Sequence, residues 1–104
     1  MSLKDMQQKV DEWTNQFKLQ YWHPHEILAR LIEETGELAR EINHLHGPKK
    51  KKSSEETKEL ADEMGDILVT LSCLANSKNI NLDEAFENTL NKMYGRDNNR
   101  FERK

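Results

Sequence analysis

The sequence predicts an all-α protein whose four helices form a bundle-like domain, and three observations support this. Glycine and proline, which end helices or build turns, number only four and two among 104 residues. The strong helix formers Leu, Glu, Lys and Ala are plentiful. Apolar residues recur at spacings of three and four, which is the period of a helix that buries one face. At this length we expect one domain over residues 1–104.

The first helix is expected from Leu3 to about Leu19, with Ser2 as its N-cap. Its apolar residues follow a spacing of 3, 4, 3 and 4. They are Leu3, Met6, Val10, Trp13 and Phe17. This stripe predicts that Trp13 and Phe17 belong to the core before they serve any other purpose.

The second helix is expected from Pro24, a residue favoured at the first helical position, to about Leu45. A basic loop over residues 46–54, with the sequence HGPKKKKSS, follows it. Its lysine run, 49–52, is most simply a solvated loop that could also steer anions. The loop is short, so the second helix and the next one should pack as antiparallel neighbours.

The third helix is expected over 53–77 and the fourth from about Asn81 to the polar, basic tail at 95–104. Ser53 with Glu56, and Asn81 with Glu84, have the spacing of capping boxes. The second half of the third helix, ILVTLSCLA, is apolar on most sides. We therefore expect it to be central, and to be covered in part by a second subunit.

Composition excludes several classes of protein. The net charge of −3 argues against a partner that is a nucleic acid polymer. The longest apolar stretch, 67–75, is too short to cross a bilayer, and the N-terminus has no apolar signal core, so no membrane partner is expected. The lone Cys73 permits no internal disulfide, and it is interpreted as a small hydrophobe rather than a nucleophile. These observations favour a cytoplasmic protein.

The second and third helices each carry a short acidic pattern. The patterns are Glu33-Glu34-Thr-Gly-Glu37 and Glu63-Met-Gly-Asp66. On a helical wheel, Glu34 and Glu37 lie about 60° and 120° to one side of their apolar stripe. Glu63 and Asp66 have the same offsets, about 60° and 120°, in the same sense. In an antiparallel pair, equal offsets of the same sense emerge on one side.

The heights of these acids along the pair agree with their angles. Glu37 and Glu63 each lie roughly 12 Å from the connecting loop, and Glu34 and Asp66 each roughly 16 Å. We therefore expect Glu37 to face Glu63 and Glu34 to face Asp66 around one groove. Four converging carboxylates repel one another, and oxygen ligands suit Mg²⁺, with Mn²⁺ as a possible substitute. A magnesium groove in turn suggests a phosphorylated substrate.

Two other interpretations of the acids stay open. Acidic runs on helices are often solvated faces, as in a non-catalytic module that dimerises or docks a partner. Glu41 and His44 have the Glu-x-x-His spacing of di-iron bundles, but such sites need the motif twice, and Asp66 stands where the second histidine would be required. The four histidines form no convincing ligand set, which leaves surface or capping roles for them.

The chain resembles the MazG-type all-alpha nucleoside triphosphate pyrophosphohydrolases, whose signature is EExxE on one helix and ExxD on the next. The stretches LARLIEETGELAREIN and ELADEMGDILVTLSCLAN, and the closing KMYGRDNNRF, are similar to the short single-domain YpjD-like branch. The resemblance implies hydrolysis of an NTP or dNTP to the monophosphate and pyrophosphate, as nucleotide-pool housecleaning. It also implies Glu34, Glu37, Glu63 and Asp66 as metal ligands, and a homodimer or homotetramer.

The resemblance extends to other candidate residues. Glu37 would position or deprotonate the attacking water, supported by Glu33, which points roughly 160° from the stripe. The substrate would be bound by the following residues: Lys92, Arg96, Arg100, Trp13 and Trp22. A solvated basic tail is the alternative for the three bases. A phosphohydrolase acting on a different phosphoester is a weaker reading of the same acids.

Overall fold

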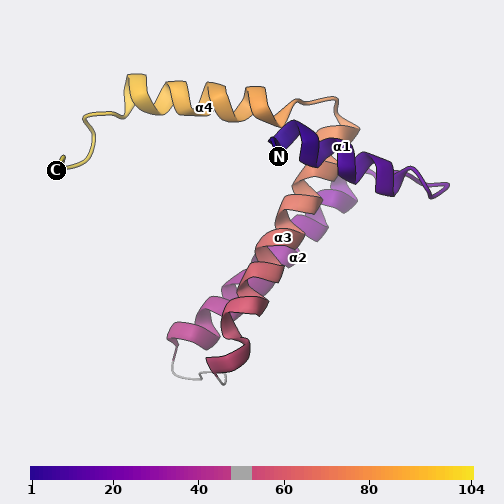
Figure 1. The fold of residues 1–104 in the computed structure, drawn as a ribbon, viewed down its shortest axis with the longest axis horizontal. Helices are drawn as coiled ribbons and strands as arrows, with labels where there is room; N and C mark the ends of the chain where they lie inside the picture. The colour runs from indigo at the N-terminus through magenta and orange to yellow at the C-terminus, as the bar shows by residue number, and fades with distance from the viewer. Residues whose placement is uncertain (48–52) are drawn as a thin grey trace.

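The part of the chain that the structure describes folds into four helices, as the sequence predicts. The structure is a computed structural model that describes residues 1–47 and 53–104, with side chains from residue 59 onward in the second range. Within those ranges it contains no strand (Figure 1). The helices are α1 (Leu3–Thr14), α2 (Pro24–His46), α3 (Ser53–Ser77) and α4 (Leu82–Arg96). Of the basic loop expected over 46–54, His46 belongs to α2 and residues 53–54 to α3, while 48–52 lie outside this description. The side chains of Ser53 and Glu56, the expected capping pair, lie outside it too.

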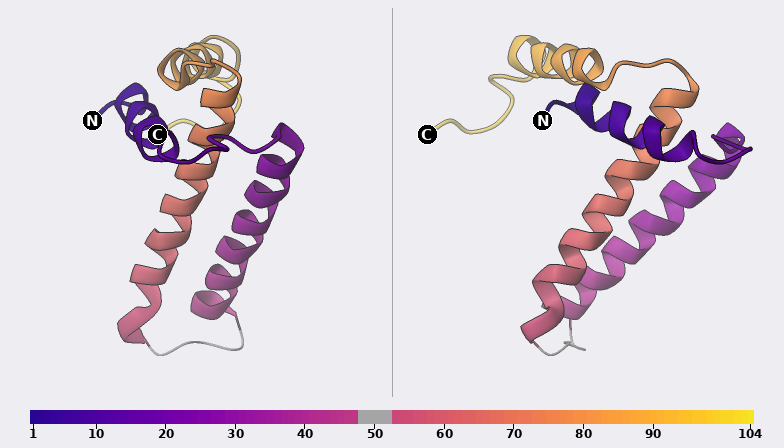
Figure 2. Two further views of the ribbon diagram at one scale, coloured as in Figure 1. Left: turned by 90° about the vertical axis from the view of Figure 1, so that its right-hand side faces the viewer. Right: turned by 45° about the vertical axis from the view of Figure 1, so that its right-hand side comes forward.

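The two longest helices, α2 and α3, form an antiparallel hairpin, which is the most extensive helix pairing in the molecule (Figures 1 and 2). Helix α1 crosses the end of this hairpin where α2 begins and α3 ends, and there it packs against α3. Helix α4 contacts the start of α1 and then runs away from the hairpin, towards the C-terminus. The four helices of one chain are therefore splayed, and the α2–α3 pair is uncovered along much of its length.

Helix α1 ends at Thr14, five residues before the expected Leu19. The Thr14 hydroxyl donates to the Val10 carbonyl at 3.0 Å, and the chain then tightens into turns. The side chain of Gln20 folds back and donates to the Asp11 carbonyl at 3.3 Å. The Gln16 and Phe17 amides donate to the Trp13 and Thr14 carbonyls, at 3.4 and 3.2 Å, and so form turns in which each bond spans three residues. Continued helix would bond each of these carbonyls to an amide one residue further along, so the helix stops although the apolar stripe continues.

Side chains set the starts of α2 and α4. His23 is the N-cap of α2: its Nδ1 accepts from the His25 amide at 3.3 Å, while Glu26 Oε1 accepts from the His23 amide at 3.2 Å. Asn81 Oδ1 caps α4 by accepting from the Asp83 amide at 2.9 Å. A capping role for histidine, one of the two roles expected from the sequence, is therefore seen at His23.

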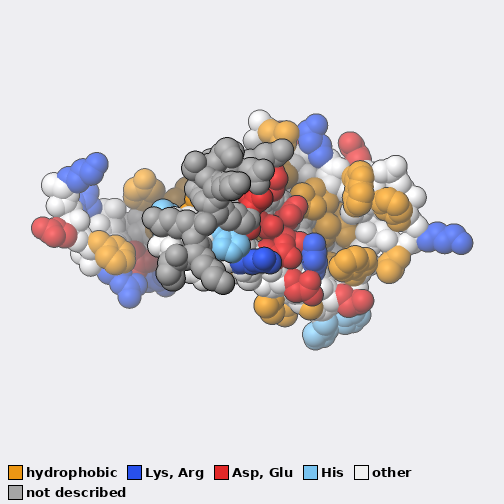
Figure 3. All heavy atoms as spheres, turned by 90° about the horizontal axis from the view of Figure 1, so that it is seen from below, with side chains coloured by type: hydrophobic (Ala, Val, Ile, Leu, Met, Phe, Trp, Pro, Cys, Tyr) orange, Lys and Arg blue, Asp and Glu red, His pale blue; other side chains and the backbone are white. Residues whose placement is uncertain are grey.

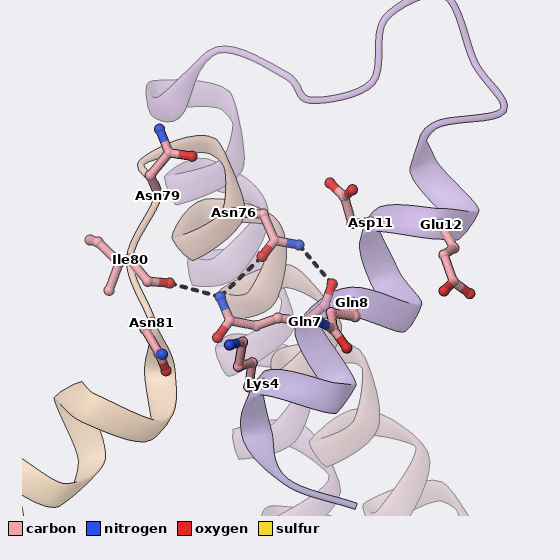
Figure 4. A pocket seen from close by; sticks show the side chains of 9 residues that line it. All are labelled: Lys4, Gln7, Gln8, Asp11, Glu12, Asn76, Asn79, Ile80 and Asn81. Atoms are coloured by element: carbon pink, nitrogen blue, oxygen red, sulfur yellow. Dashed lines mark hydrogen bonds between the residues drawn. The ribbon is translucent and has the colours of Figure 1, made fainter.

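A polar network joins α1, α3 and α4 (Figure 4). The buried Gln7 donates from Nε2 to Asn76 Oδ1 at 3.0 Å and to the Ile80 carbonyl at 2.8 Å. Gln7 Oε1 accepts from the Leu82 amide at 2.8 Å. Asp83 adds a second link, because its carboxylate accepts from the backbone amide of Leu3 at 3.0 Å. The crossing of these helices is thus fixed largely by hydrogen bonds.

The apolar core of one chain is small. Among the described residues, the buried hydrophobic side chains are Val10, Ile27 and Ala75. Trp13 and Phe17, expected in the core, are 61% and 51% exposed, because they line an open hollow instead of a closed core. Figure 3 shows apolar side chains spread over the surface beside the acidic ones. No helix in the described ranges has the length and apolar character needed to cross a membrane.

Candidate metal centre

Three carboxylates from the two hairpin helices meet in one group. Glu34 and Glu37 come from α2 and Glu63 from α3, and one oxygen of each lies within 4.8 Å of the others. The spacing of three residues puts the first two on one side of α2, and the antiparallel pairing brings α3 to the same height. The geometry places Glu63 beside Glu37 and Glu34, as the wheel and height arguments predict for the pair of Glu37 and Glu63.

The group is partly withdrawn from solvent and short of cations. Glu34 is only 1% exposed. Its Oε1 pairs with Arg30, while its Oε2 and the Oε2 of Glu63 are buried and accept no hydrogen bond among the described residues. A buried carboxylate oxygen without a hydrogen-bond partner lowers the stability of the fold, and repulsion among three carboxylates lowers it further. An all-oxygen donor set with two unsatisfied buried oxygens fits a hard divalent cation such as Mg²⁺.

The mutual repulsion of the three carboxylates contributes to a raised pKa at Glu63. The pKa of Glu63 is raised from 4.5 to about 7, first by removal from water and then by the charge of Glu37, by hydrogen bonds to Glu34 and Glu37, and by the charge of Glu34. Without a cation, one proton is therefore shared within the cluster near neutral pH.

The remaining members of the acidic patterns lie outside this group. Asp66 is exposed on α3 and lines a hollow next to the cluster together with Glu34. Glu33 is 63% exposed and pairs with Arg30, whose Nη1 lies 3.2 Å from Glu33 Oε2. This exposure agrees with the helical wheel, on which Glu33 points away from the apolar stripe because it lies about 100° round the helix from Glu34.

The hollow has a volume of about 540 Å³ and two chemically different groups of lining residues. Arg30, Glu34 and Asp66 are the charged ones. Most of the others are aromatic or apolar: Trp13, Phe17, Leu19, Tyr21, Trp22, Ile27, Val69 and Cys73. Sites for drug-sized ligands have this size and this mixture of apolar walls with a few polar groups. Trp13 and Trp22, the expected base-binding residues, thus lie in the same hollow as two of the expected metal ligands.

The loop after α1 carries these aromatic side chains and is held by hydrogen bonds. Tyr21 donates its hydroxyl to Asp11 Oδ1 at 2.5 Å and accepts from Asn76 Nδ2 at 3.0 Å. Burial, followed by the bond to Asp11, raises the pKa of Tyr21. Trp13 and Phe17 meet edge to face, with ring centroids 5.1 Å apart. The sequence analysis missed Asp11 and Asn76 because their partners lie far away in sequence.

The expected basic residues do not reach the three-carboxylate cluster of their own chain. Lys92 and Arg96 lie on α4, which runs away from the hairpin, and Arg100 follows it (Figure 1). Arg96 and Arg100 instead share Asp97, with nitrogen to oxygen distances of 3.2 and 3.5 Å. In one chain, the structure therefore separates the basic tail from the acidic cluster.

Other features fit a metal or nucleophilic centre less well. His44 Nδ1 lies 3.9 Å from Glu41 Oε1, but no second Glu-x-x-His pair faces it in the described ranges, as a di-iron bundle requires. Cys73 is half-buried rather than fully buried, and burial raises the pKa of its thiol, so it is a poor nucleophile. A larger hollow of about 640 Å³, between α1 and the α3–α4 turn, contains none of the clustered carboxylates.

Comparison with known proteins identifies a family and a fold. The MazG nucleotide pyrophosphohydrolase domain matches residues 22–101. The chain is 48% identical to YpjD of Bacillus subtilis (strain 168) over 103 residues, covering 99% of this chain and 93% of YpjD.

Two solved structures share the arrangement of the helices. The crystal structure of Bacillus subtilis YpjD superposes with a TM-score of 0.82 and 48% identity, over 88% of this chain and 94% of that one. A Bacillus-conserved MazG protein, a nucleotide pyrophosphohydrolase, superposes with a TM-score of 0.78 and 44% identity, over 89% and 90% of the two chains.

Proposed function

The chain belongs to the MazG nucleotide pyrophosphohydrolase family, and from that premise we propose that it hydrolyses a nucleoside triphosphate, NTP or dNTP, to the monophosphate and pyrophosphate. One observation carries the proposal. The three-carboxylate cluster shares Glu34 with a hollow that aromatic side chains also line, so a single ligand with a flat base and a polyphosphate suits both groups of residues. Such a reaction suits nucleotide-pool housecleaning in the cytoplasm.

The cluster is proposed to hold Mg²⁺, with Mn²⁺ as a substitute. Glu34, Glu37 and Glu63 would supply oxygens from the cluster, and Asp66 an oxygen from the adjoining wall of the hollow. When bound, a divalent cation neutralises charge on the phosphates and makes a bound water more acidic. The two unsatisfied buried oxygens, Glu34 Oε2 and Glu63 Oε2, support this assignment.

The protein's own residues would orient the substrate and move a proton. Trp13 and Trp22 would hold the base by stacking, which is worth about 1–3 kcal/mol per base. Water attacks the α-phosphorus, and its proton passes to the exposed carboxylate of Glu37. The bond from the α-phosphorus to the bridging oxygen breaks, and pyrophosphate leaves. Glu33 would orient the cluster through Arg30, which it shares with Glu34.

A second copy of the chain would complete the site. Lys92, Arg96 and Arg100 would neutralise the triphosphate, but α4 carries them away from the hairpin of their own chain. A homodimer or homotetramer that covers the exposed faces of α2 and α3 would allow α4 of one subunit to approach the cluster of another. Neither a membrane nor a nucleic acid polymer is needed as a partner.

The decisive experiment identifies products. The protein is incubated with a panel of NTPs and dNTPs and Mg²⁺, and the products are separated by ion-exchange chromatography. Monophosphate and pyrophosphate in equal amounts are expected. Diphosphate with orthophosphate, or no turnover across the panel, would refute the proposal and favour a phosphohydrolase of another class or a non-catalytic docking module.

Variants test the assignment of the carboxylates. Glu34→Gln and Asp66→Asn should each lower kcat/KM on the order of a hundredfold or more, because each weakens the hold on the cation that neutralises the transition state. Asp62→Asn, which neutralises an exposed acid on α3 outside the cluster, is the matched control and should keep the wild-type rate. Wild-type turnover by either of the first two at saturating Mg²⁺ would show that the ligands are wrongly assigned.

A further inference from the structure

Arg30 bridges two acids at the edge of the carboxylate cluster. It lies on α2, one turn before Glu34, so its long side chain reaches along the helix towards both Glu33 and Glu34. One terminal nitrogen, Nη1, is 3.2 Å from Glu33 Oε2, and the other pairs with Glu34 Oε1. The same carboxylate of Glu34 belongs to the candidate metal centre. Arg30 therefore pairs with a carboxylate that a cation would also bind.

The two partners in this ion pair differ in their freedom to move. Glu34 is almost completely buried, whereas the side chain of Arg30 is 44% exposed. A change of partner would therefore move the guanidinium and leave the carboxylate in place. Arg30 also lines the hollow, and it is the one Lys or Arg among the residues lining that hollow. A displaced Arg30 would remain beside any phosphate that enters there.

Charge decides when the partner changes. Without a metal ion, Arg30 is the cation that compensates the buried charge of Glu34, which would otherwise be costly. A divalent cation on Glu34 would lie next to the guanidinium, and like charges at such short range repel. A triphosphate supplies several negative oxygens, for which the planar fork of arginine is well suited.

We propose that Arg30 is a positioning residue that exchanges partners: it pairs with Glu34 in the metal-free protein and turns to a phosphate of the nucleotide when a divalent cation takes its place. The inference rests on the proposed function, because it concerns the same cluster and hollow. It goes further by assigning two opposed effects to one side chain. Arg30 competes with the metal ion, and it assists the nucleotide.

Arg30→Gln tests both effects with two separate titrations. Isothermal titration of Mg²⁺ alone should give an affinity about tenfold higher than that of the wild type, because one competing positive charge is gone. Titration of α,β-methylene-ATP, which resists cleavage of the α–β bond, in saturating Mg²⁺ should give an affinity about tenfold lower. General damage to the fold would weaken both ligands, so opposite signs distinguish the exchange from a structural role.

Two further variants serve as controls. Lys78→Gln removes one positive charge from the exposed end of α3 and should leave both affinities within about twofold of the wild type. Arg30→Lys keeps the charge but loses the fork, so its Mg²⁺ affinity should stay near the wild-type value. A thermal melt in EDTA should show Arg30→Gln to be less stable than Arg30→Lys, because only the first leaves Glu34 without a cation.

The outcomes separate this inference from the proposed function. Unchanged or weaker Mg²⁺ binding by Arg30→Gln overturns the competition with the metal. Unchanged analogue binding by that variant, or no binding by the wild type, overturns the transfer to phosphate. If the nucleotide panel gives no turnover while Arg30→Gln still tightens Mg²⁺, the proposed reaction fails and the pairing of Arg30 with the metal ligand stands.

Discussion

Two acidic residues at the centre of the hairpin, Glu34 and Glu63, are placed where burial destabilises the charged form of a carboxyl group. Glu34 is buried beside one guanidinium, and Glu63 keeps a buried oxygen that accepts no hydrogen bond among the described residues. A structural ion pair would satisfy both oxygens of a buried carboxylate, since leaving one unsatisfied costs stability. The unsatisfied oxygens therefore favour an interpretation as a binding site over one as a solvated acidic face.

The raised pKa of Glu63 predicts how stability depends on pH in the metal-free protein. Between pH 4.5 and about 7 the folded protein holds a proton on Glu63 that the unfolded chain releases. The stabilisation due to this proton is complete below pH 4.5 and is lost as the pH rises through about 7. In EDTA, the melting temperature should therefore fall across this interval more steeply for the wild type than for Glu63→Gln, which cannot release a proton.

Mg²⁺ should reverse this trend. A metal ion displaces the proton, so the increase in melting temperature caused by Mg²⁺ should be larger at pH 8 than at pH 5.5. Glu63→Gln should show a much smaller increase at both values. An equal Mg²⁺ effect on wild type and variant would mean that Glu63 takes no part in binding the ion.

At the scale of the elements, two kinds of interaction hold the helices. The α2–α3 hairpin follows from apolar periodicity and a short loop, whereas the crossing of α1 with α3 and α4 depends on the buried amide of Gln7. The same network continues through Asn76 to Tyr21, and so fixes the loop whose aromatic side chains line the hollow. The shape of the hollow is thus tied to the polar junction.

Gln7→Leu should destabilise the protein by about 2–4 kcal/mol, because it leaves the Leu82 amide, the Ile80 carbonyl and Asn76 Oδ1 without their partner. Urea unfolding measures the loss. Gln8→Leu makes the same chemical change at an exposed neighbour and should alter the free energy of unfolding by less than about 0.5 kcal/mol. Similar effects of the two substitutions would show that the network contributes little.

At the scale of the whole molecule, one chain is more open than a compact domain of its length. Its radius of gyration is 17.0 Å, against about 13 Å for a compact domain of this length. Its accessible surface is 8550 Å², against about 6,100 Å² for a monomer of this mass. Apolar side chains such as Ile32 on α2 and Phe86 on α4 are 64% and 58% exposed. Exposed apolar surface of this extent favours association with a second copy.

Light scattering coupled to size exclusion should give a molar mass of two or four times 12.3 kDa. Ile32→Glu and Phe86→Glu place charge on exposed apolar positions and should each lower that mass and the rate of hydrolysis together. Asn88→Glu adds the same charge about 200° round α4 from Phe86 and should preserve both. A wild-type mass of 12.3 kDa would refute the oligomer and leave the basic tail without a route to the cluster.

The sequence by itself determined the helices, the hairpin and the meeting of Glu37 with Glu63, because helical period, caps and a short loop are local properties. Only the tertiary structure decided where α1 ends, since tight turns at Gln16 and Phe17 replace further helix and the loop after them is tied to Asn76 through Tyr21. It also decided that Trp13 lines a hollow instead of the core, and that α4 leaves the hairpin. These outcomes depend on contacts between residues distant in the chain, which a periodic pattern does not encode.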